Sequence, residues 1–388
     1  EMKTTPDKGR GLYATKLVKK DETIFEEKPL VSSQFSWNSA YGYLACSFCM
    51  KPLETAEVNV RRLTTNYTIE LPHPECCKNQ EILTKHTQCD QCGVKYCSEE
   101  CRTDAFKQYH QSLCFGCPID NPENPFFKLN EYWKHIHYPP ETASIMLFVR
   151  ILGMVVQSEN KQELLQKFNE FQDKSVNEDL MIFHKLLGEN FVNKIDDLFK
   201  LLSEAFQGSS TESLKWLTPE GFRSLFALIG TNGQGIGTSS FADWVKNVGE
   251  LKLADDERES LDALIDNLYE KLDDVAGSFL NNEGSALYLQ QSKINHSCRP
   301  NAEVHFPFSN HVAKVVALRD INAGEEICIS YLDDCALDRS RHSRQKLLQE
   351  NYLFLCQCEK CDEQINDPDL TSDEEDEMDD EEDDKMSD

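Results

Sequence analysis

The cysteines constrain the possible folds of this chain more than any other feature. The 388 residues include 16 cysteines, and most of them are spaced as CxxC, CxxxC, HxxxC or CxCxxC. These spacings suit tetrahedral zinc, whereas disulfide-rich scaffolds are typically small secreted domains. We therefore predict reduced, metal-bound thiols and a location in the cytoplasm and nucleus.

A block between Cys46 and Cys117 is too rich in cysteine and histidine to form an ordinary hydrophobic core. Its spacing offers eight ligands, enough for two zinc ions. These ligands are Cys46, Cys49, Cys89, Cys92, Cys97, Cys101, His110 and Cys114. About 39 residues separate Cys49 from Cys89, and substitute ligands are available in or near the block. The substitutes are His73, Cys76, Cys77, His86 and Cys117.

The net charge of −28 is unevenly distributed. Residues 371–388 hold 12 acidic side chains and one lysine, which leaves −17 for the remainder. Such a chain is not expected to bind nucleic-acid phosphates directly, and basic proteins are better partners. No apolar run is long enough for a bilayer, so we expect no membrane span. The acidic tail is predicted to be disordered, and phosphorylation of Thr371 or Ser372 is a hypothesis.

The order of predicted elements indicates a β domain interrupted twice. Short strands are expected near residues 8–14, 24–25 and 29–31, and again at 304–306, 313–318 and 327–329. Between them, apolar residues at helical spacing over 145–152 and 182–191 and an acidic stretch over 255–274 predict helices. We predict a loop over Gly230–Gly237 because it contains four glycines.

Four motifs follow one another within about 70 residues near the C-terminal end. They are Asn295-His296-Ser297-Cys298-Arg299-Pro300-Asn301, Gly324-Glu325-Glu326, Ser330-Tyr331 and Cys356-x-Cys358-x-x-Cys361. Together with the cysteine block, they resemble the SET and MYND family of protein-lysine methyltransferases. The chain is most similar to a short, divergent branch of that family with an acidic tail.

The resemblance implies an α+β fold in which a β-rich SET domain is interrupted by a zinc-binding MYND module and a helical insert. The implied parts are residues 1–45 (N-terminal part of the SET domain), 46–117 (MYND-type zinc module with a long insert), 118–285 (helical insert), 286–340 (C-terminal core of the SET domain), 341–365 (post-SET zinc segment) and 366–388 (disordered acidic tail).

The resemblance also implies S-adenosylmethionine as cofactor and about three zinc ions. The cofactor-binding residues would be Lys8, Gly9, Arg10, Gly11, Asn232, Asn295, His296, Tyr331 and Phe354. The catalytic residues would be Tyr331 and Tyr352 at the lysine channel. The segment Gly277-Ser278-Phe279 is an alternative to Asn232, since it partly matches the same family pattern.

The implied metal sites divide the ligands into three sets. One MYND site would use Cys46, Cys49, Cys97 and Cys101, and the other Cys89, Cys92, His110 and Cys114. A third site would join Cys298 to Cys356, Cys358 and Cys361. That third metal would hold the C-terminal segment against the cofactor loop.

The implied function is methylation of lysine on basic proteins, such as histone tails or ribosomal proteins, by a monomer. Longer family members continue into a helical C-terminal domain, whereas 27 residues follow Cys361 here. We therefore expect a more open substrate cleft. The alternative is a non-catalytic adaptor whose MYND module binds proline-containing or basic peptides.

Overall fold

The computed structural model describes residues 1–5, 8–77, 82–136, 144–171, 191–207, 215–277 and 280–369. The acidic tail from 370 onward, with Thr371 and Ser372, lies outside this described part. The same holds for residues 182–190 of the helix predicted over 182–191, and for Ser278 and Phe279.

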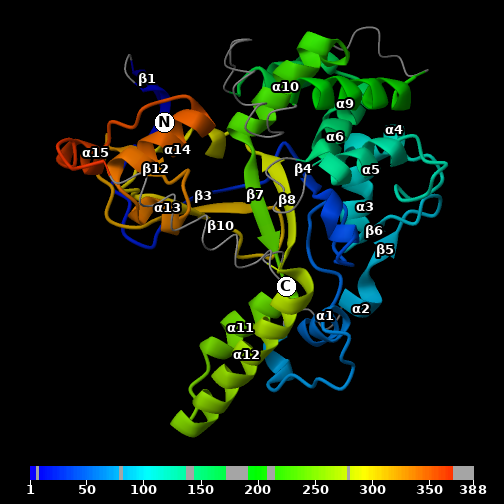
Figure 1. The fold of residues 1–388 in the computed structure, drawn as a ribbon, viewed down its shortest axis with the longest axis horizontal. Coiled ribbons are helices and arrows are strands. Elements are labelled where there is room, and N and C mark those ends of the chain that lie inside the picture. The colour runs from blue at the N-terminus through cyan, green and yellow to red at the C-terminus, as the bar shows by residue number, and fades with distance from the viewer. Residues whose placement is uncertain are drawn as a thin grey trace.

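Three small sheets form the β part of the molecule (Figure 1). The first has the order β1-β2-β12-β9, the second β10-β11-β3 and the third β4-β8-β7. Their strands are β1 (Met2–Thr5), β2 (Gly9–Tyr13), β3 (Thr23–Glu27), β4 (Val31–Gln34), β7 (Gln234–Thr238), β8 (Asn282–Leu287), β9 (Asn295–His296), β10 (Ala302–His305), β11 (Ala313–Ala317) and β12 (Glu326–Ile329). The predicted strands are confirmed to within a few residues, while β1, β7, β8 and β9 were not predicted.

The first sheet joins the two ends of the described chain. Strand β12 pairs antiparallel with β2, so that Ile327 lies opposite Leu12. On its other side β12 pairs in parallel with β9, which places Cys328 opposite Asn295. Three motifs distant in sequence, the early glycines, the Asn-His pair and the Glu-Glu pair, therefore meet on neighbouring strands.

The cysteine-rich block forms a compact module beside these sheets. It contains a two-stranded ribbon, β5 (Thr87–Gln88) and β6 (Lys95–Tyr96), and the helices α3 (Glu99–Ala105) and α4 (Gln111–Leu113). A π-helical turn, Phe106–His110, joins the two helices. π-Helical turns are rare and frequently occur at functional sites, and this one ends on the predicted ligand His110.

The long segment between Cys49 and Cys89 packs outside the rest of the cysteine-rich module. It holds α1 (Ala56–Leu63), the turn Pro74–Cys76 and α2 (Ile82–Lys85). Helix α1 packs against α11 (Ser240–Gly249) and α12 (Asp255–Ala276), which project as a hairpin away from the sheets (Figure 1). The extra length therefore builds a separate hydrophobic cluster around Val60, Trp244 and Leu268.

The largest hydrophobic core lies among the helices of the insert. It is formed by α5 (Phe127–Ile136), α6 (Ile145–Gln157), α7 (Lys161–Phe168), α9 (Phe191–Ala205) and α10 (Pro219–Asn232). Helix α6 is buried over most of its length, which explains why its sequence is almost continuously apolar. None of the described helices combines the length and apolar character that a membrane span requires.

The prediction of a loop over Gly230–Gly237 is wrong. Gly230 to Asn232 complete helix α10, and Gln234–Thr238 forms strand β7. Phe222 and Phe226 anchor the helix in the core, and backbone pairing with β8 holds the strand, so tertiary contacts override the glycine content. Strand β8 also crosses the predicted boundary between residues 285 and 286.

The last three helices of the described part of the chain lie beside the first sheet (Figure 1). They are α13 (Asp334–Asp338), α14 (Arg341–Tyr352) and α15 (Glu359–Glu363). Leu353 ends α14 in the left-handed conformation, with φ of 60°. The chain then reverses and brings Phe354 and the last cysteines back toward β9.

Candidate active site and metal centres

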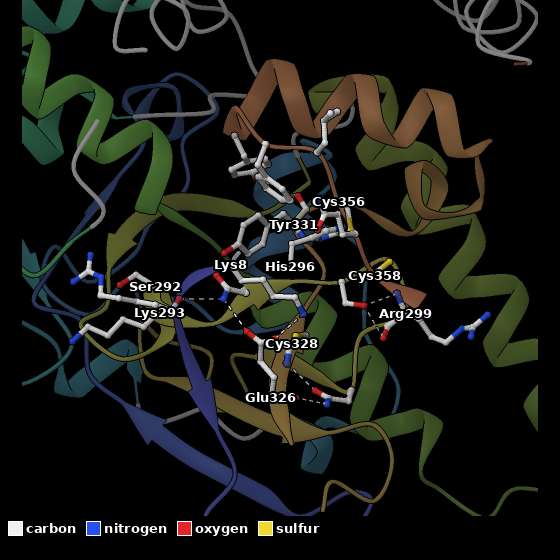
Figure 2. A pocket seen from close by; sticks show the side chains of 18 of the residues that line it. Lys8, Ser292, Lys293, His296, Arg299, Glu326, Cys328, Tyr331, Cys356 and Cys358 are labelled. Atoms are coloured by element: carbon white, nitrogen blue, oxygen red, sulfur yellow. Dashed lines mark hydrogen bonds and ion pairs between the residues drawn. The ribbon is translucent and has the colours of Figure 1, made fainter. Parts of the chain in front are cut away.

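A cavity of about 470 Å³ lies between the first sheet, the end of α10 and the segment after α14 (Figure 2). Eight of the predicted cofactor and catalytic residues line it. They are Lys8, Arg10, Asn232, Asn295, His296, Tyr331, Tyr352 and Phe354. Gly9 and Gly11 lie on β2 beside it. The structure therefore brings together residues that span more than 300 positions of sequence.

Gly11 permits close packing at the floor of this cavity. A Cβ atom at position 11 would lie 2.6 Å from Glu326 Oε1 and 2.9 Å from Asn295 Nδ2. Asn295 uses that amide to donate to Glu326 Oε1, at 2.9 Å, and to the carbonyl of Arg10, at 3.1 Å. A larger residue at position 11 would displace this pair.

Lys8 completes the polar floor through its contact with Glu326. Its ammonium lies 3.0 Å from Glu326 Oε2. The hydrogen bond to Glu326 raises the pKa of Lys8, so this side chain stays positively charged. The cavity therefore offers a fixed cation next to an amide donor and a carboxylate.

His296 links the cavity to a cysteine. Its Nδ1 accepts a hydrogen bond from the backbone N–H of Tyr331, at 2.9 Å, and its Nε2 lies 3.3 Å from Cys298 Sγ. Because a backbone N–H can only donate, Nδ1 must be unprotonated and the proton of the neutral ring is on Nε2. Burial lowers the pKa of His296 to about 4, which agrees with a neutral ring. The Nε2–H group therefore points its proton at the sulfur.

Tyr331 is fixed at both its backbone and its hydroxyl. The hydroxyl donates to the carbonyl of Ile294, at 2.7 Å. Burial raises the pKa of Tyr331, so the phenol keeps its proton at neutral pH. The oxygen retains lone pairs that could face a substrate.

Three aromatic rings form one wall of the cavity. The rings of Tyr331 and Tyr352 lie 4.8 Å apart, and the Phe354 ring stands perpendicular to that of Tyr331 at 6.3 Å. The Tyr352 hydroxyl donates to the carbonyl of Tyr331, at 3.3 Å. Such a wall can hold a flat heterocycle or a cation.

Asn232 reaches the cavity from the last turn of α10. Its amide donates to the carbonyl of Leu228, at 2.9 Å, and its side chain is buried. The alternative segment begins at Gly277, which ends α12 and is not among the residues that line this cavity.

Four cysteines meet at the edge of the cavity, and we call them the post-SET cluster: Cys298, Cys356, Cys358 and Cys361. Their sulfur atoms all lie within 4.8 Å of one another, with Cys298 Sγ 3.6 Å from Cys361 Sγ. A tetrahedral zinc with Zn–S bonds of about 2.3 Å would separate its sulfurs by about 3.8 Å. The four thiols therefore fit one zinc ion.

The cysteine-rich module contains two further sets. The first MYND cluster is Cys46, Cys49, Cys97 and Cys101, and the second MYND cluster is Cys89, Cys92, His110 and Cys114. Cys49 lies 3.6 Å from Cys97, and Cys92 lies 3.5 Å from His110 Nε2. These are the interleaved sets that the family resemblance implies. The substitute ligands His73, Cys76, Cys77, His86 and Cys117 belong to none of the three sets.

The structure adds cavity residues to which no role was assigned from sequence. Glu326 belongs to the Gly-Glu-Glu motif, so its position was signalled although its role was not. Glu170 had no sequence signal at all. Its carboxylate lies 2.8 Å from Lys293 Nζ, and its carbonyl accepts from Arg10 at 2.8 Å. It thereby joins the insert to the SET strands.

Comparison with known proteins agrees with this architecture. The SET domain family matches residues 9–332. The chain is 53% identical over 377 residues to protein-lysine N-trimethyltransferase SMYD5 of Gallus gallus, covering 97% of this chain and 89% of the relative. It is 52% identical over 367 residues to the protein of the same name from Homo sapiens, covering 95% and 87%.

A more distant relative is the histone-lysine N-methyltransferase SET5 of Scheffersomyces stipitis. It is 25% identical over 381 residues, which cover 93% of this chain and 63% of the relative. The matched SET domain and the near-complete alignment with the vertebrate proteins show that this chain belongs to the SET and MYND family of protein-lysine N-methyltransferases.

Proposed function

We propose that this methyltransferase uses S-adenosylmethionine to methylate lysine side chains of basic proteins such as histones or ribosomal proteins. The observation that supports it most is the convergence of Asn295, His296, Tyr331 and Phe354 on one cavity. The vertebrate relatives are named N-trimethyltransferases, and we extend the proposal to trimethylation.

The cavity residues fit the chemical parts of this cofactor. Lys8 and Arg10 could bind its carboxylate. The Phe354 ring offers a stacking face for adenine. The volume of about 470 Å³ falls within the range of ligand sites, roughly 300–1,000 Å³.

Bound S-adenosylmethionine would supply an electrophilic methyl group carried by a positively charged sulfur. The chain would contribute alignment and oxygen atoms that stabilise positive charge. Tyr331 has a neutral hydroxyl fixed on Ile294, and its position beside Tyr352 would orient the substrate amine. The aromatic wall would exclude water and favour an alkylammonium group by cation–π contact.

The proposal includes about three zinc ions with structural roles. Each cluster already supplies four protein ligands, which leaves no coordination position open for a substrate. The zinc ions would stabilise the fold and would not take part in methyl transfer.

The test uses purified full chain with radiolabelled S-adenosylmethionine and either core histones or ribosomal proteins. We expect label on lysine and a loss of at least about 100-fold in kcat for Tyr331→Phe, because a positioned oxygen would be removed. Tyr67→Phe is the matched control, since Tyr67 is 72% exposed and is not among the cavity residues. The proposal would be refuted if label reached neither core histones nor ribosomal proteins. Full activity of Tyr331→Phe would refute it as well.

Binding partners and location form part of the same proposal. We infer a monomer of the cytoplasm and nucleus, where thiols stay reduced and basic substrates are abundant. The MYND-type module could also bind proline-containing peptides. The methyltransferase relatives favour the enzyme over a non-catalytic adaptor, and calorimetry with S-adenosylmethionine separates the two because an adaptor need not bind it.

A further inference from the structure

Within the described part of the chain, two buried arginines have no acidic partner. Arg344 is 0% exposed and Arg150 is 9% exposed. Among the described residues, every hydrogen bond of the two guanidinium groups goes to a carbonyl, an amide, a hydroxyl or a sulfur, and none to a carboxylate. A buried charge is costly unless an opposite charge compensates it. The surroundings of both side chains should therefore contain negative charge of another kind.

Arg344 is in contact with the post-SET cluster. It projects from α14, and its Nη2 lies 3.8 Å from Cys361 Sγ. The same nitrogen donates to Gln364 Oε1 at 2.7 Å, and Nη1 donates to the carbonyl of Arg339 at 2.5 Å. These two neutral acceptors orient the guanidinium but do not compensate its charge.

Arg150 lies beside the cysteine-rich module and reaches it through Ser47 and Tyr109 rather than through a sulfur. It projects from α6 and donates to Ser47 Oγ at 3.1 Å, and Ser47 lies in the loop between Cys46 and Cys49. Its guanidinium stacks 4.7 Å from the centre of the Tyr109 ring, whose hydroxyl donates to the Ser47 carbonyl. A cation from the helical insert is thus buried against the first MYND cluster.

Metal-bound thiolates would supply the missing negative charge. Zinc held by four thiolates carries two net negative charges, because each cysteine binds as the anion. A hydrogen bond from an N–H group to such a sulfur is charge-assisted. We propose that Arg344 is the internal counter-cation of the post-SET zinc centre and controls metal retention there, and that Arg150 does the same for the MYND-type module.

This role would connect metal retention to the active site. The post-SET cluster includes Cys298, which lies 3.3 Å from His296 Nε2, and His296 Nδ1 accepts from the backbone of Tyr331. Arg344 contacts the post-SET cluster at Cys361, and His296 contacts it at Cys298. Arg344 would thus be a positioning residue that acts through the metal centre.

The experiment measures zinc directly and needs neither cofactor nor methyl acceptor. Full-length wild type, Arg344→Met, Arg344→Lys and Arg150→Met are purified with zinc, and the metal is counted by plasma mass spectrometry. Zinc release is then followed by absorbance with an excess of 4-(2-pyridylazo)resorcinol, which serves as both chelator and indicator. Alkylation by iodoacetamide, read by peptide mass spectrometry, identifies which cysteines become exposed. Arg341→Met is the matched control, because Arg341 is on the same helix and contacts the Cys361 carbonyl but no sulfur.

We expect three zinc ions in wild type and in Arg341→Met. In Arg344→Met, release from one centre should be about 10–100-fold faster, as for other residues that support metal ligands. Alkylation should appear first at Cys298, Cys356, Cys358 and Cys361. Arg344→Lys keeps the charge, so its rate of zinc release should lie between the rates of wild type and Arg344→Met. Arg150→Met should give the reverse pattern, with Cys46, Cys49, Cys97 and Cys101 exposed first.

Three results would overturn the inference. They are unchanged release in Arg344→Met, simultaneous loss from all three centres in that variant, and a wild type that holds no zinc in the post-SET cluster. Because methyl transfer is not measured, a failure here is distinct from a failure of the proposed activity. Arg344→Lys guards against general unfolding, since its melting curve should match that of wild type while its zinc release differs.

Discussion

Glycine at position 11 shows how one small residue shapes the cavity beside β2. The amide of Asn295 and the carboxylate of Glu326 occupy the space that a side chain at position 11 would need. Both groups line the cavity, and Glu326 also holds Lys8. The absence of a Cβ at position 11 therefore sets the positions of three polar groups.

The variant Gly11→Ala should weaken binding of S-adenosylmethionine by about tenfold or more, since overpacking typically costs about 1–3 kcal/mol and tenfold corresponds to about 1.4 kcal/mol. Isothermal calorimetry measures the dissociation constant. Gly249→Ala is the control, because a Cβ there would meet nothing within 4 Å. Equal affinity of wild type and Gly11→Ala would show that the cofactor does not depend on this packing.

The two ring nitrogens of His296 can be tested separately. A Gln side chain can place its amide near the former Nε2 and keep the donor to Cys298, whereas Asn can keep the acceptor for the Tyr331 N–H. We expect His296→Gln to retain zinc but to lower kcat by about tenfold, and His296→Asn to lose zinc faster, because each lost hydrogen bond to a charged or buried partner is worth about 1–3 kcal/mol. Kinetics and zinc counting together distinguish the variants. If both variants lost kcat and zinc equally, the two nitrogens would have no separate roles.

Strand β8 is the central element of the third sheet, and it has little room for side chains at one position. It pairs with β4 on one side and with β7 on the other. A Cβ atom at Gly284 would lie 2.3 Å from the carbonyl oxygen of Ser33 and 2.5 Å from Met50 Cε. The backbone of β4 and a core methionine thus both require glycine here.

We expect Gly284→Ala to lower the free energy of unfolding by about 1–3 kcal/mol, because the backbone oxygen cannot move without breaking the sheet. Gly237→Ala, on the paired strand β7, is the matched control, since its nearest neighbour would be Asn281 at 3.7 Å. Thermal melting followed by circular dichroism measures both. Similar melting temperatures for the two variants would contradict this account of β8.

The elements that carry ligand spacing or motif residues were predictable from sequence. The family resemblance assigned Cys298 to the late cysteines, whose three thiols leave a zinc site one ligand short. Strand β7 was not predictable, since its glycines are typical of a loop and only pairing with β8 makes it a strand. Glu170 could not be found either, because nothing local marks a residue whose contacts are 160 and 123 positions away.

Excess negative charge characterises the molecule as a whole. The sequence outside residues 371–388 carries −17, and helix α12 presents many acidic side chains to solvent. A field of this sign should attract cationic proteins over distances of about one Debye length, which is roughly 10 Å at 0.1 M salt. The cavity itself holds paired charges, so its ligand should be less affected.

We expect the KM for a basic protein substrate to rise several-fold when NaCl increases from about 0.02 M to about 0.3 M, because salt screens the attraction. The KM for S-adenosylmethionine should change much less over the same range. Initial rates with one substrate varied at a time provide both constants. A KM for the protein substrate that is independent of salt would argue against long-range attraction by the acidic surface.

The pairing of β2 with β12 has a consequence for biosynthesis. Leu12 cannot pair with Ile327 until that residue has been synthesised. In the same way, Cys298 cannot contact Cys361 until synthesis has reached position 361. While the ribosome is still translating, β2, β3 and β4 lack their partners from the C-terminal part, whereas the cysteine-rich module and the insert helices can fold as they emerge. Premature termination before β12 is complete should therefore yield polypeptides with exposed strand edges, which chaperones would need to protect from aggregation.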